Sequence, residues 1–297
     1  MNLRASTRAS PLARLQTDLV ARMIADGVKG AEVEPVVVET AGDRRADAPL
    51  WAIGGQGVFA KEVQAAVLEG RADIAVHSAK DLPSTEPDGL VLAAVPSRGD
   101  ARDALVGCTL DALPVGGRVG TGSVRRRAQL AWRRPDLRFG TLRGNIGTRL
   151  DKASDFDAVV VASVALRRLG RSELMAELLH PRVMVPQVGQ GALAVECRAD
   201  DDRTREVLAA IDDPASHRTL DAERAWLAEL GGGCDLPAGA YALAEGRRVH
   251  LSAVLGSLDG RILIRDRDSG EDPVELGRGL ARRMLDESGG EALLSGL

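Results

Sequence analysis

The sequence DIAVHSAKD occupies residues 73–81 and joins an apolar run to a polar turn. The run Ile74–Val76 does not alternate with polar residues, which is typical of a strand buried on both faces in an α/β protein. Such a strand delivers the turn from His77 to Asp81 at its carboxyl end, where open α/β sheets place their ligand sites. The stretch therefore predicts an α/β lobe with a candidate site at this turn.

Outward from this stretch, the first third of the chain alternates predicted strands and helices. A helix begins at Ser10 and Pro11, because Ser is a favoured N-cap and Pro fits the first helical position. The predicted elements are strands over Leu3–Thr7, Val33–Glu39 and Asp73–Ser78, and helices from Ser10 to about Ala25 and over Phe59–Glu69. Between them, the polar, glycine-rich segment Thr40–Gly57 is a long loop of the kind that is functional or disordered.

A second α/β unit follows from about Asp100 to Val185. Its predicted elements are strands over Arg118–Thr121, Leu137–Leu142 and Ala158–Ala162, and helices over Ser123–Arg134, Ile146–Ala153 and Val164–Leu169. We interpret Val185–Gly189 as a crossing strand and Gly191–Arg198 as a strand that returns the chain to the first unit. Two crossings predict a two-lobed clamp with a hinge.

The last part of the chain changes character. A helix over Ala215–Leu230 is followed by a meander and a final helix, which together predict a small α+β domain. The predicted elements are strands over Tyr241–Ala244, Val249–Leu255 and Arg261–Arg267, a hairpin turn at Leu258–Gly260 and a helix over Pro273–Glu287. We therefore expect three domains: residues 1–96 with 190–212, residues 97–189, and residues 213–297.

Composition excludes several classes of protein. The 297 residues are 44% hydrophobic and 28% charged, as in a globular protein of more than one domain, and no apolar run approaches the roughly 20 residues that span a bilayer. A net charge of −4 and 2% aromatic residues argue against a nucleic-acid binder. The three cysteines have neither disulfide nor metal spacing and the N-terminus lacks a secretory apolar region, so we expect a cytoplasmic protein.

One of the three cysteines lies where its thiol is expected to be accessible for a reaction. The sequence GGGCDLP at residues 231–237 puts Cys234 on a glycine-rich loop directly after a predicted helix. The glycines permit close approach by a large group, and Pro237 prevents the loop from continuing as a helix. This pattern indicates a covalent attachment point or a nucleophile. The alternative is equally open here, because glycine after a helix is also ordinary capping chemistry.

Two further stretches indicate anion sites. GTGSVRRR at residues 120–127 and LRGNIGTR at residues 142–149 each place small residues and arginines at a strand-to-helix turn. Free N–H groups at a helix start favour carboxylates or phosphates, and Thr121 or Ser123 can cap the helix. Three adjacent arginines cannot all face one ligand, so at least one is structural, and a solvated basic helix face is the alternative.

Further arginines outline a cleft. Arg8, Arg167 and Arg168 follow other predicted strands, so guanidinium groups would line a cleft from both lobes. In such a cleft Asp81 would stay ionised and could move a proton to and from nitrogen, although capping a loop is the ordinary role of Asp after a strand.

Long motifs in order resemble the porphobilinogen deaminase (hydroxymethylbilane synthase) family over essentially the whole chain. The motifs are STRASPLA (6–13), GDRRADAPL (42–50), GGQGVFAKE (54–62), RADIAVHSAKDLP (71–83), GTGSVRRRAQL (120–130), LRGNIGTRL (142–150), VGQGALAVECR (188–198) and GGGCDLPAGAY (231–241). The resemblance implies a transferase of porphyrin, tetrapyrrole and heme biosynthesis. Its first two lobes would resemble periplasmic binding proteins.

The resemblance also implies a cofactor and a mechanism. Cys234 would hold a dipyrromethane primer through a thioether, four porphobilinogen molecules would be added stepwise with loss of ammonia, and water would release 1-hydroxymethylbilane. Asp81 would be the catalytic acid and base. We expect a monomer without an obligate protein partner, with porphobilinogen as the small-molecule partner and with no metal, nucleic acid or membrane.

Family positions assign the remaining site residues. Positions matching cofactor contacts are Lys80, Asp81, Thr121, Ser123, Arg125, Arg126, Arg143 and Gly144, and positions matching substrate contacts are Arg8, Ser10, Phe59, Arg149, Arg168 and Gln190. Three positions depart from the family: Gln56 where Lys is frequent, Gly122 where Ser is common and Arg167 where Lys is common. Thr40–Gly57 matches a mobile lid.

Two other functions remain to be separated from this one. A non-catalytic two-lobed binder of a polycarboxylate would also explain the arginines. A Cys234 nucleophile in acyl or phosphoryl transfer is a weaker alternative, because a free thiol has a pKa of about 8.5 and no general base lies beside the loop in sequence.

Overall fold

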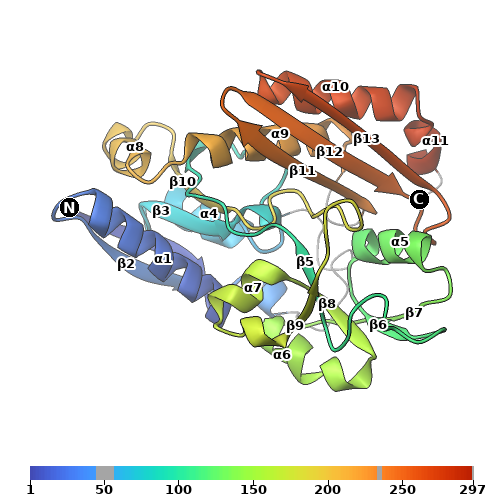
Figure 1. The fold of residues 1–297 in the computed structure, drawn as a ribbon. Helices are drawn as coiled ribbons and strands as arrows, with labels where there is room; N and C mark the ends of the chain where they lie inside the picture. Colours follow the sequence, from blue (N-terminus) through green and yellow to red (C-terminus); the bar gives the residue numbers. More distant parts are fainter. Residues whose placement is uncertain (45–56, 233–235, 296–297) are drawn as a thin grey trace. The chain divides into compact units, whose positions relative to one another are not determined.

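The computed structural model describes residues 1–44, 57–232 and 236–295. Its described chain divides into two compact units, Met1–Gly99 with Gly191–His217 and Asp100–Gln190 with Arg218–Leu297 (Figure 1). We describe each unit by itself. Cys234, Gln56 and most of the segment 40–57 lie outside the described residues.

The first unit is built on a five-stranded mixed sheet in the order β2-β1-β3-β10-β4. Strand β1 is parallel to β2 and β3, whereas β10 is antiparallel to both β3 and β4. Strand β10 therefore lies inside the sheet although it comes last in sequence. The strands are β1 (Asn2–Arg8), β2 (Glu32–Val38), β3 (Ile74–Ser78), β4 (Leu90–Ala94) and β10 (Leu193–Arg198).

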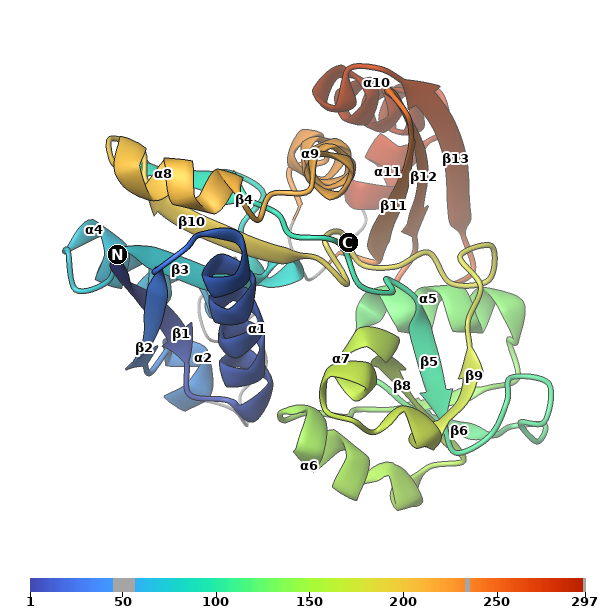
Figure 2. The same cartoon turned by 60° about the vertical axis from the view of Figure 1, so that its left-hand side comes forward.

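Helices cover both faces of this sheet (Figure 2). Leu3, Ile74 and Val76 pack with the helices α1 and α8, while Ala75 packs with α4 on the other face. Both faces of β3 are thus buried, which explains its unbroken apolar sequence. The helices are α1 (Pro11–Gly27), α2 (Ala41–Arg44), α4 (Lys61–Leu68) and α8 (Asp202–Ala209), with a 3₁₀ turn η1 (Ala79–Asp81).

The second unit contains a second five-stranded sheet in the order β7-β6-β8-β5-β9. Strand β6 is parallel to β7 and β8, and β5 is antiparallel to β8 and β9. The strands are β5 (Asp103–Val106), β6 (Arg118–Gly120), β7 (Arg138–Gly140), β8 (Ala158–Ala162) and β9 (Met175–Leu178). The helices are α5 (Val124–Arg133), α6 (Ile146–Asp151) and α7 (Ser163–Arg168), with the 3₁₀ turns η2 (Ala153–Asp155) and η3 (Ser172–Leu174).

The same unit contains a three-stranded antiparallel meander, β11-β12-β13. Helix α10 lies along one face of this sheet (Figure 1), and Trp226, Leu251 and Leu280 are fully buried in the core between helices and sheet. The elements are β11 (Ala238–Glu245), β12 (Arg248–Gly256), β13 (Leu263–Gly270), α9 (Pro214–Glu229), α10 (Pro273–Asp286) and α11 (Gly290–Ser295).

The predicted fold class is confirmed, with two α/β sheets and a small C-terminal sheet packed with helices. The crossing strand predicted over Val185–Gly189 is wrong, because these residues belong to no strand. Pro186 has no N–H to give to a sheet. The backbone of Val185 instead bonds to the Gln129 side chain, which donates to its oxygen at 3.0 Å and accepts from its nitrogen at 2.8 Å.

Six helices and strands of the described chain lie where the sequence analysis predicted none: α2, β4, β5, β9, α8 and α11. Strand β9 has the sequence MAEL, whose residues favour helices, so its pairing with β5 overrides local propensity. Strand β5 begins with Asp103, a residue type depleted in strands. The division into three domains stays a prediction.

Two glycines of α10 provide a test of this packing. A Cβ on Gly277 would collide with the Ala222 carbonyl oxygen and lie 2.8 Å from the Trp226 nitrogen, whereas a Cβ on Gly279 would meet nothing within 4 Å. Gly277→Ala should lower the free energy of unfolding by about 1–3 kcal/mol through overpacking. Gly279→Ala should raise it by about 0.5–1 kcal/mol, because Ala is the better helix former. Urea unfolding followed by circular dichroism checks both, and equal effects would contradict the close packing of α9 on α10.

Candidate functional site

In the first unit, the candidate residues lie at one edge of the sheet. Strands β1 and β3 are parallel, with Ser6 opposite Ala75, so their carboxyl ends meet at that edge. Arg8 ends β1, and Ser10 caps α1 by accepting a hydrogen bond from the Ala13 nitrogen at 3.3 Å. The turn η1, which follows β3, brings Lys80 and Asp81 to the same edge. The structure thus brings together the residues predicted from STRAS and HSAKD.

Asp81 is the last residue of η1 and is half-buried. Within the described residues, no hydrogen bond or ion pair engages its carboxylate. The turn itself is held by backbone bonds, because the Ala79 nitrogen donates to the Ala192 oxygen at 3.1 Å and the Leu82 nitrogen to the Ala79 oxygen at 3.2 Å. A carboxylate on a fixed turn is suited to exchange protons with a ligand.

Arg8 and Phe59 form a stacked pair. The Arg8 guanidinium carbon lies 4.0 Å from the centroid of the Phe59 ring, within the range of a cation–π interaction. A Cβ on Gly42 would collide with the same ring, so α2 also lies against Phe59. The two predicted substrate contacts therefore support each other, and Phe59 limits where the Arg8 guanidinium can lie.

In the second unit, the turn from β6 to α5 has the predicted capping arrangement. Ser123 is the N-cap of α5 and accepts from the Arg126 nitrogen at 3.4 Å, while the Thr121 hydroxyl accepts from the Ser123 nitrogen at 3.2 Å. Arg127 is exposed over the Phe139 ring. Arg125 and Arg126 are only 3% and 5% exposed, so the alternative of a solvated basic face is wrong for these two.

Asp103 on β5 forms ion pairs with both buried arginines, Arg125 and Arg126. Arg125 Nη1 lies 2.8 Å from Asp103 Oδ2, and Arg126 Nε and Nη2 lie 3.0 and 2.8 Å from Oδ1. Gln190 donates to the same Oδ1 at 3.0 Å. Burial alone would raise the pKa of Asp103, but Arg125 and Arg126 hold it well below its usual range. Burial lowers the pKa of Arg125, although Asp103 opposes that change.

This cluster places one carboxylate against two guanidinium groups, so it carries one excess positive charge away from water. Arg125 Nε and Nη2 are buried and have no hydrogen-bond partner among the described residues. A buried charge and unsatisfied donors are costly unless an anion pairs with them. Arg125 also lies against β11, because a Cβ on Gly239 would be 2.9 Å from Arg125 Cδ. The donors therefore fit a ligand carboxylate near the start of β11.

The remaining predicted residues of this unit are spread over other turns. Arg149 Nε donates to the Gly144 oxygen at 2.9 Å, and Gly144 has a φ of 102°, which only glycine adopts easily. Arg143 is half-buried in the same turn. Arg168 is the last residue of α7, and burial lowers its pKa to about 10.

Two departures from the family have local explanations. A Cβ on Gly122 would lie 2.8 Å from the Leu142 carbonyl oxygen, so the backbone here suits glycine. Arg167 is half-exposed and lies 3.1 Å from Asp100 in an ion pair. Gln56 lies outside the described residues.

Cys234 also lies outside the described residues, but Gly231 and Gly232, the first two residues of its loop, are described. Gly231 has a φ of 65° and donates to the Ala228 oxygen at 3.0 Å, as a glycine after a helix does. A Cβ on Gly232 would collide with the Leu236 side chain. Helix capping by glycine is therefore confirmed for the start of this loop. It is compatible with a Cys234 thiol that attaches a group or acts as a nucleophile.

The other two cysteines are poor candidates for a reactive thiol. Burial raises the pKa of Cys197 to about 11, and burial also raises the pKa of Cys108. Both thiols are free and would stay protonated near neutral pH.

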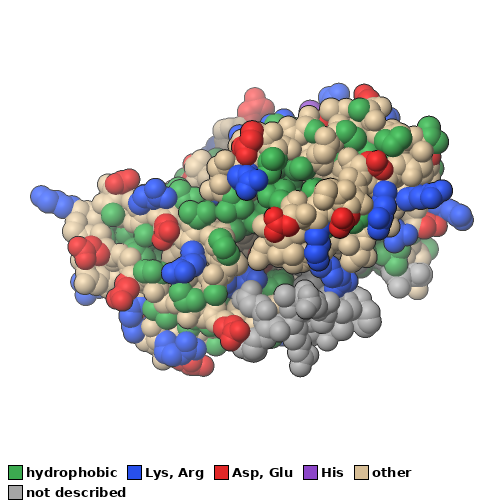
Figure 3. All heavy atoms as spheres, turned by 90° about the horizontal axis from the view of Figure 1, so that it is seen from below, with side chains coloured by type: hydrophobic (Ala, Val, Ile, Leu, Met, Phe, Trp, Pro, Cys, Tyr) green, Lys and Arg blue, Asp and Glu red, His purple; other side chains and the backbone are tan. Residues whose placement is uncertain are grey.

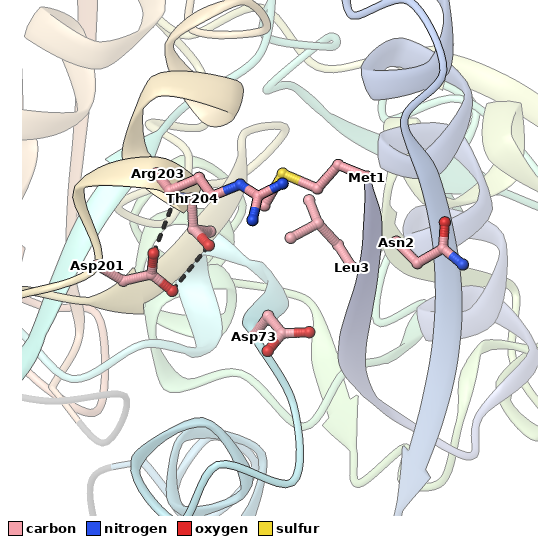
Figure 4. Close-up of a pocket in the computed structure, with 7 residues that line it drawn as sticks. All are labelled: Met1, Asn2, Leu3, Asp73, Asp201, Arg203 and Thr204. Atoms are coloured by element: carbon pink, nitrogen blue, oxygen red, sulfur yellow. Dashed lines mark hydrogen bonds between the residues drawn. The ribbon is translucent and has the colours of Figure 1, made fainter.

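A surface pocket of 350 Å³ lies in the first unit, away from the candidate residues (Figure 4). Its lining includes Met1, Asn2 and Leu3 at the amino end of β1 and Asp73 just before β3. Because β1 and β3 are parallel, this is the sheet edge opposite Asp81. Asp201 in the pocket accepts from the Thr204 nitrogen and hydroxyl at 3.0 and 2.8 Å. Both carboxylates in the lining are paired with arginines, Asp73 with Arg4 and Asp201 with Arg198, each at 2.9 Å.

Acidic and basic side chains are interspersed over the face seen in Figure 3. Such a mixed face lacks the clustered positive charge of a nucleic-acid-binding surface. Within the described ranges, no helix is both long and apolar enough to cross a membrane.

Asp103 is the functional residue that sequence reasoning missed. Its signal was a single Asp at the start of the apolar run ALV, residues 104–106, in a chain rich in arginine. A buried Asp requires charged partners, and paired arginines are the most suitable ones.

Comparisons with known proteins agree with the motifs. Residues 3–206 match the family model described as "Porphobilinogen deaminase, dipyromethane cofactor binding domain", and residues 218–286 match "Porphobilinogen deaminase, C-terminal domain". Porphobilinogen deaminase of Roseiflexus castenholzii is 49% identical over 99% of both chains. That of Acidothermus cellulolyticus is 46% identical over 98% of this chain and 91% of the relative. Among solved structures, the methionine-binding protein MetQ is 10% identical over 72% of this chain and 91% of its own, with a TM-score of 0.45.

Removing the charge of Asp103 tests the buried cluster. Asp103→Asn leaves two buried guanidinium groups without a counter-charge, so we expect the free energy of unfolding to fall by about 3–5 kcal/mol. Urea unfolding at neutral pH measures the loss. Because the folded pKa of Asp103 is lowered, its contribution is complete above about pH 5 and falls as the pH decreases further, and the variant should lack that part of the acid dependence.

The control is Glu173→Gln, which breaks an exposed pair with Arg171 at 3.3 Å. It should change the free energy of unfolding by less than about 1 kcal/mol. A loss in Asp103→Asn no larger than in the control would contradict the central role of Asp103.

Proposed function

Because the chain belongs to the porphobilinogen deaminase family, we propose that Asp81 and the arginines of both units carry out its deaminating condensation on a primer attached to Cys234. The enzyme is a transferase, a hydroxymethylbilane synthase, that joins four porphobilinogen molecules head to tail with loss of ammonia. Relatives with this activity match nearly the whole chain, so the non-catalytic polycarboxylate binder is not favoured.

The observation that most directly supports the site is the pair of unsatisfied donors on Arg125. A pyrrole that carries acetate and propionate groups supplies the anion that this buried, positively charged cluster lacks. The matched family domain is a dipyromethane cofactor binding domain. We propose that Arg125 and Arg126, oriented by Asp103 and Gln190, hold carboxylates of that cofactor.

The covalent link to Cys234 is part of the proposal. The cofactor would supply a terminal pyrrole carbon as the nucleophile for each new unit. Arg125 lies against Gly239, five residues after Cys234 in sequence, which supports an attachment point in this part of the chain. Thr121, Ser123, Lys80, Arg143 and Gly144 are the other proposed cofactor contacts, at the positions that match the family.

Asp81 is proposed to donate a proton and to accept one in each cycle of addition. It protonates the departing amine of porphobilinogen, the C–N bond breaks and ammonia leaves. Its carboxylate then stabilises the positive pyrrole nitrogen while the new C–C bond forms, and it accepts the proton that the ring carbon loses. The half-buried position of Asp81 on a backbone-bonded turn supports this role, because the turn is held in place and the carboxylate stays partly accessible.

Substrate carboxylates are proposed to bind the other cations. Arg8, positioned by Phe59, would take one of these groups beside Asp81. The other proposed substrate contacts are Ser10, Phe59, Arg149, Arg168 and Gln190. Of these, Gln190 also fixes Asp103, so it would act partly through the arginines.

Domain division, location and assembly complete the proposal. Each of the three sheets has its own apolar core, which supports domains at residues 1–96 with 190–212, 97–189 and 213–297. We place the enzyme in the cytoplasm, because a thiol that must bind a cofactor has to stay reduced. We propose a monomer with porphobilinogen as its small-molecule partner.

The attachment is tested by the mass of the intact protein. The purified protein should carry an adduct of two pyrrole units, and Cys234→Ala should lack both the adduct and the activity because the thioether cannot form. Cys108→Ala is the matched control and should keep both. An active wild-type protein without an adduct would refute the covalent primer.

The proton role is tested by Asp81→Asn. This variant should keep its fold and the mass adduct but lose turnover by at least about 100-fold, because the amide cannot exchange the protons. Asp88→Asn, an exposed Asp in the following loop, should retain turnover. Rates of formation of hydroxymethylbilane check both, and a near-normal rate in Asp81→Asn would disprove the assignment.

A further inference from the structure

A buried polar cluster lies beneath the turn that carries Asp81. His77 on β3, Glu196 on β10 and Gln64 on α4 are 5%, 1% and 5% exposed. Gln64 Nε2 donates to Glu196 Oε1 and Oε2 at 3.0 and 2.9 Å. His77 Nε2 lies 3.0 Å from Glu196 Oε2, at ion-pair distance but without the alignment of a hydrogen bond. None of the three has a role in the chemistry proposed above.

The cluster occupies a face that is otherwise apolar. Val63, Ala66 and Ala75 pack on the same side of the sheet, between α4 and the strands. An ionisable pair in such a place costs free energy relative to apolar side chains of similar size. A buried pair of this kind therefore contributes little to the free energy of unfolding. We ask instead which neighbouring groups the pair holds in place.

The cluster holds the end of β3. Ala194 of β10 is the register partner of His77, so Glu196 is its diagonal neighbour on the same face. The contact between His77 and Glu196 thus connects the carboxyl end of β3 to β10. Through Gln64, which binds Glu196, it also connects that end to α4. His77 precedes Asp81 by four residues, and Asp81 is the last residue of the turn η1 that follows Ser78.

The opposite face of the same strand end is also held by polar bonds. Ser78 points to the other side of the sheet, since successive side chains of a strand alternate. Gln16 on α1 donates to the Ser78 hydroxyl at 2.8 Å and accepts from it at 3.2 Å. Two adjacent residues just before η1 are thus held from both faces: His77 contacts Glu196 of β10, which Gln64 of α4 binds in turn, and Ser78 bonds to Gln16 of α1.

We propose that Glu196, with His77 and Gln64, positions the turn that carries Asp81 and so sets the orientation of its carboxylate. These are positioning residues that act through Asp81 and do not touch the reactants. The inference rests on the proposed function, in which Asp81 exchanges protons with each pyrrole unit. Small displacements of a reacting group lower rates strongly, so loss of the cluster should reduce turnover more than binding.

The first test is Glu196→Gln, which removes the charge and keeps the shape. We expect kcat to fall by about 10-fold or more while the KM for porphobilinogen changes by less than about 2-fold. The matched control is His217→Gln in the same unit, where His217 forms another histidine–carboxylate pair with Asp212 at 2.8 Å, away from η1. The control should keep kcat. A normal kcat in folded Glu196→Gln would overturn the proposal.

The second test separates positioning from general damage to the fold. In an Asp81→Asn background, Glu196→Gln should lower the residual rate by less than about 2-fold, because the group that it orients has already been removed. An equal fold-loss in both backgrounds would overturn the positioning role. Retention of high activity by Asp81→Asn alone would instead refute the assignment of Asp81, so the two failures are distinguishable.

A third variant covers the case in which Glu196→Gln does not fold. Gln64→Met is close in volume and removes only the amide donors to Glu196. It should also lower kcat with little change in KM, and circular dichroism shows whether it is folded. If folded Gln64→Met keeps the wild-type kcat, the cluster does not position Asp81.

Discussion

The carboxylate of Asp103 determines much of the second unit. It joins β5 to α5 through Arg125 and Arg126 and to the segment before Gly191 through Gln190. Arg125 also donates to the backbone oxygen of Val185, and Arg126 to that of Val160 on β8, so the two arginines that Asp103 binds also hold the neighbouring strand and the segment around Val185. Asp103 engages only Nη1 of Arg125, so the Nε and Nη2 donors of a guanidinium that is already oriented and desolvated have no partner among the described residues. That is the state in which an arginine binds a carboxylate most strongly.

The two α/β sheets use the same means to place reactive groups. In each, a polar side chain on a buried strand is held by partners from neighbouring elements: Glu196 with Gln64 and His77 in the first sheet, and Asp103 with the two arginines in the second. Glu196 and Asp103 lie on strands inside the sheets, while the groups proposed to meet the ligand, among them Asp81, Arg125 and Arg126, follow strand ends. Rigid strands therefore position groups that the loops alone would hold less well.

Local signals predicted the parts of the fold that depend on local interactions. Ser10 and Pro11 predicted the start of α1, and the run Ala158–Ala162 predicted β8 to the residue. The anion-site interpretation of Ser123 was correct about the cap. The partner of Arg125 and Arg126 could not be predicted from spacing, because Asp103 is more than 20 residues away and lies on a strand of only four residues that the sequence analysis did not predict. Local patterns singled out Asp81 and Cys234, and the family motifs supplied their expected roles, which depend on a ligand that no periodicity encodes.

The place of β10 within the first sheet has a consequence for synthesis. This strand pairs with β3 on one side and β4 on the other, so the sheet is interrupted until Arg198 has been translated. The sheet from β5 to β9 is complete in sequence by Leu178 and requires nothing from the later strand. On the ribosome, the amino-terminal strands thus emerge first and must wait with unpaired edges while later residues already have their pairing partners. The sheet of β5 to β9 is therefore expected to form before the first sheet is complete, and the nascent amino-terminal segment is where chaperone binding would be most useful.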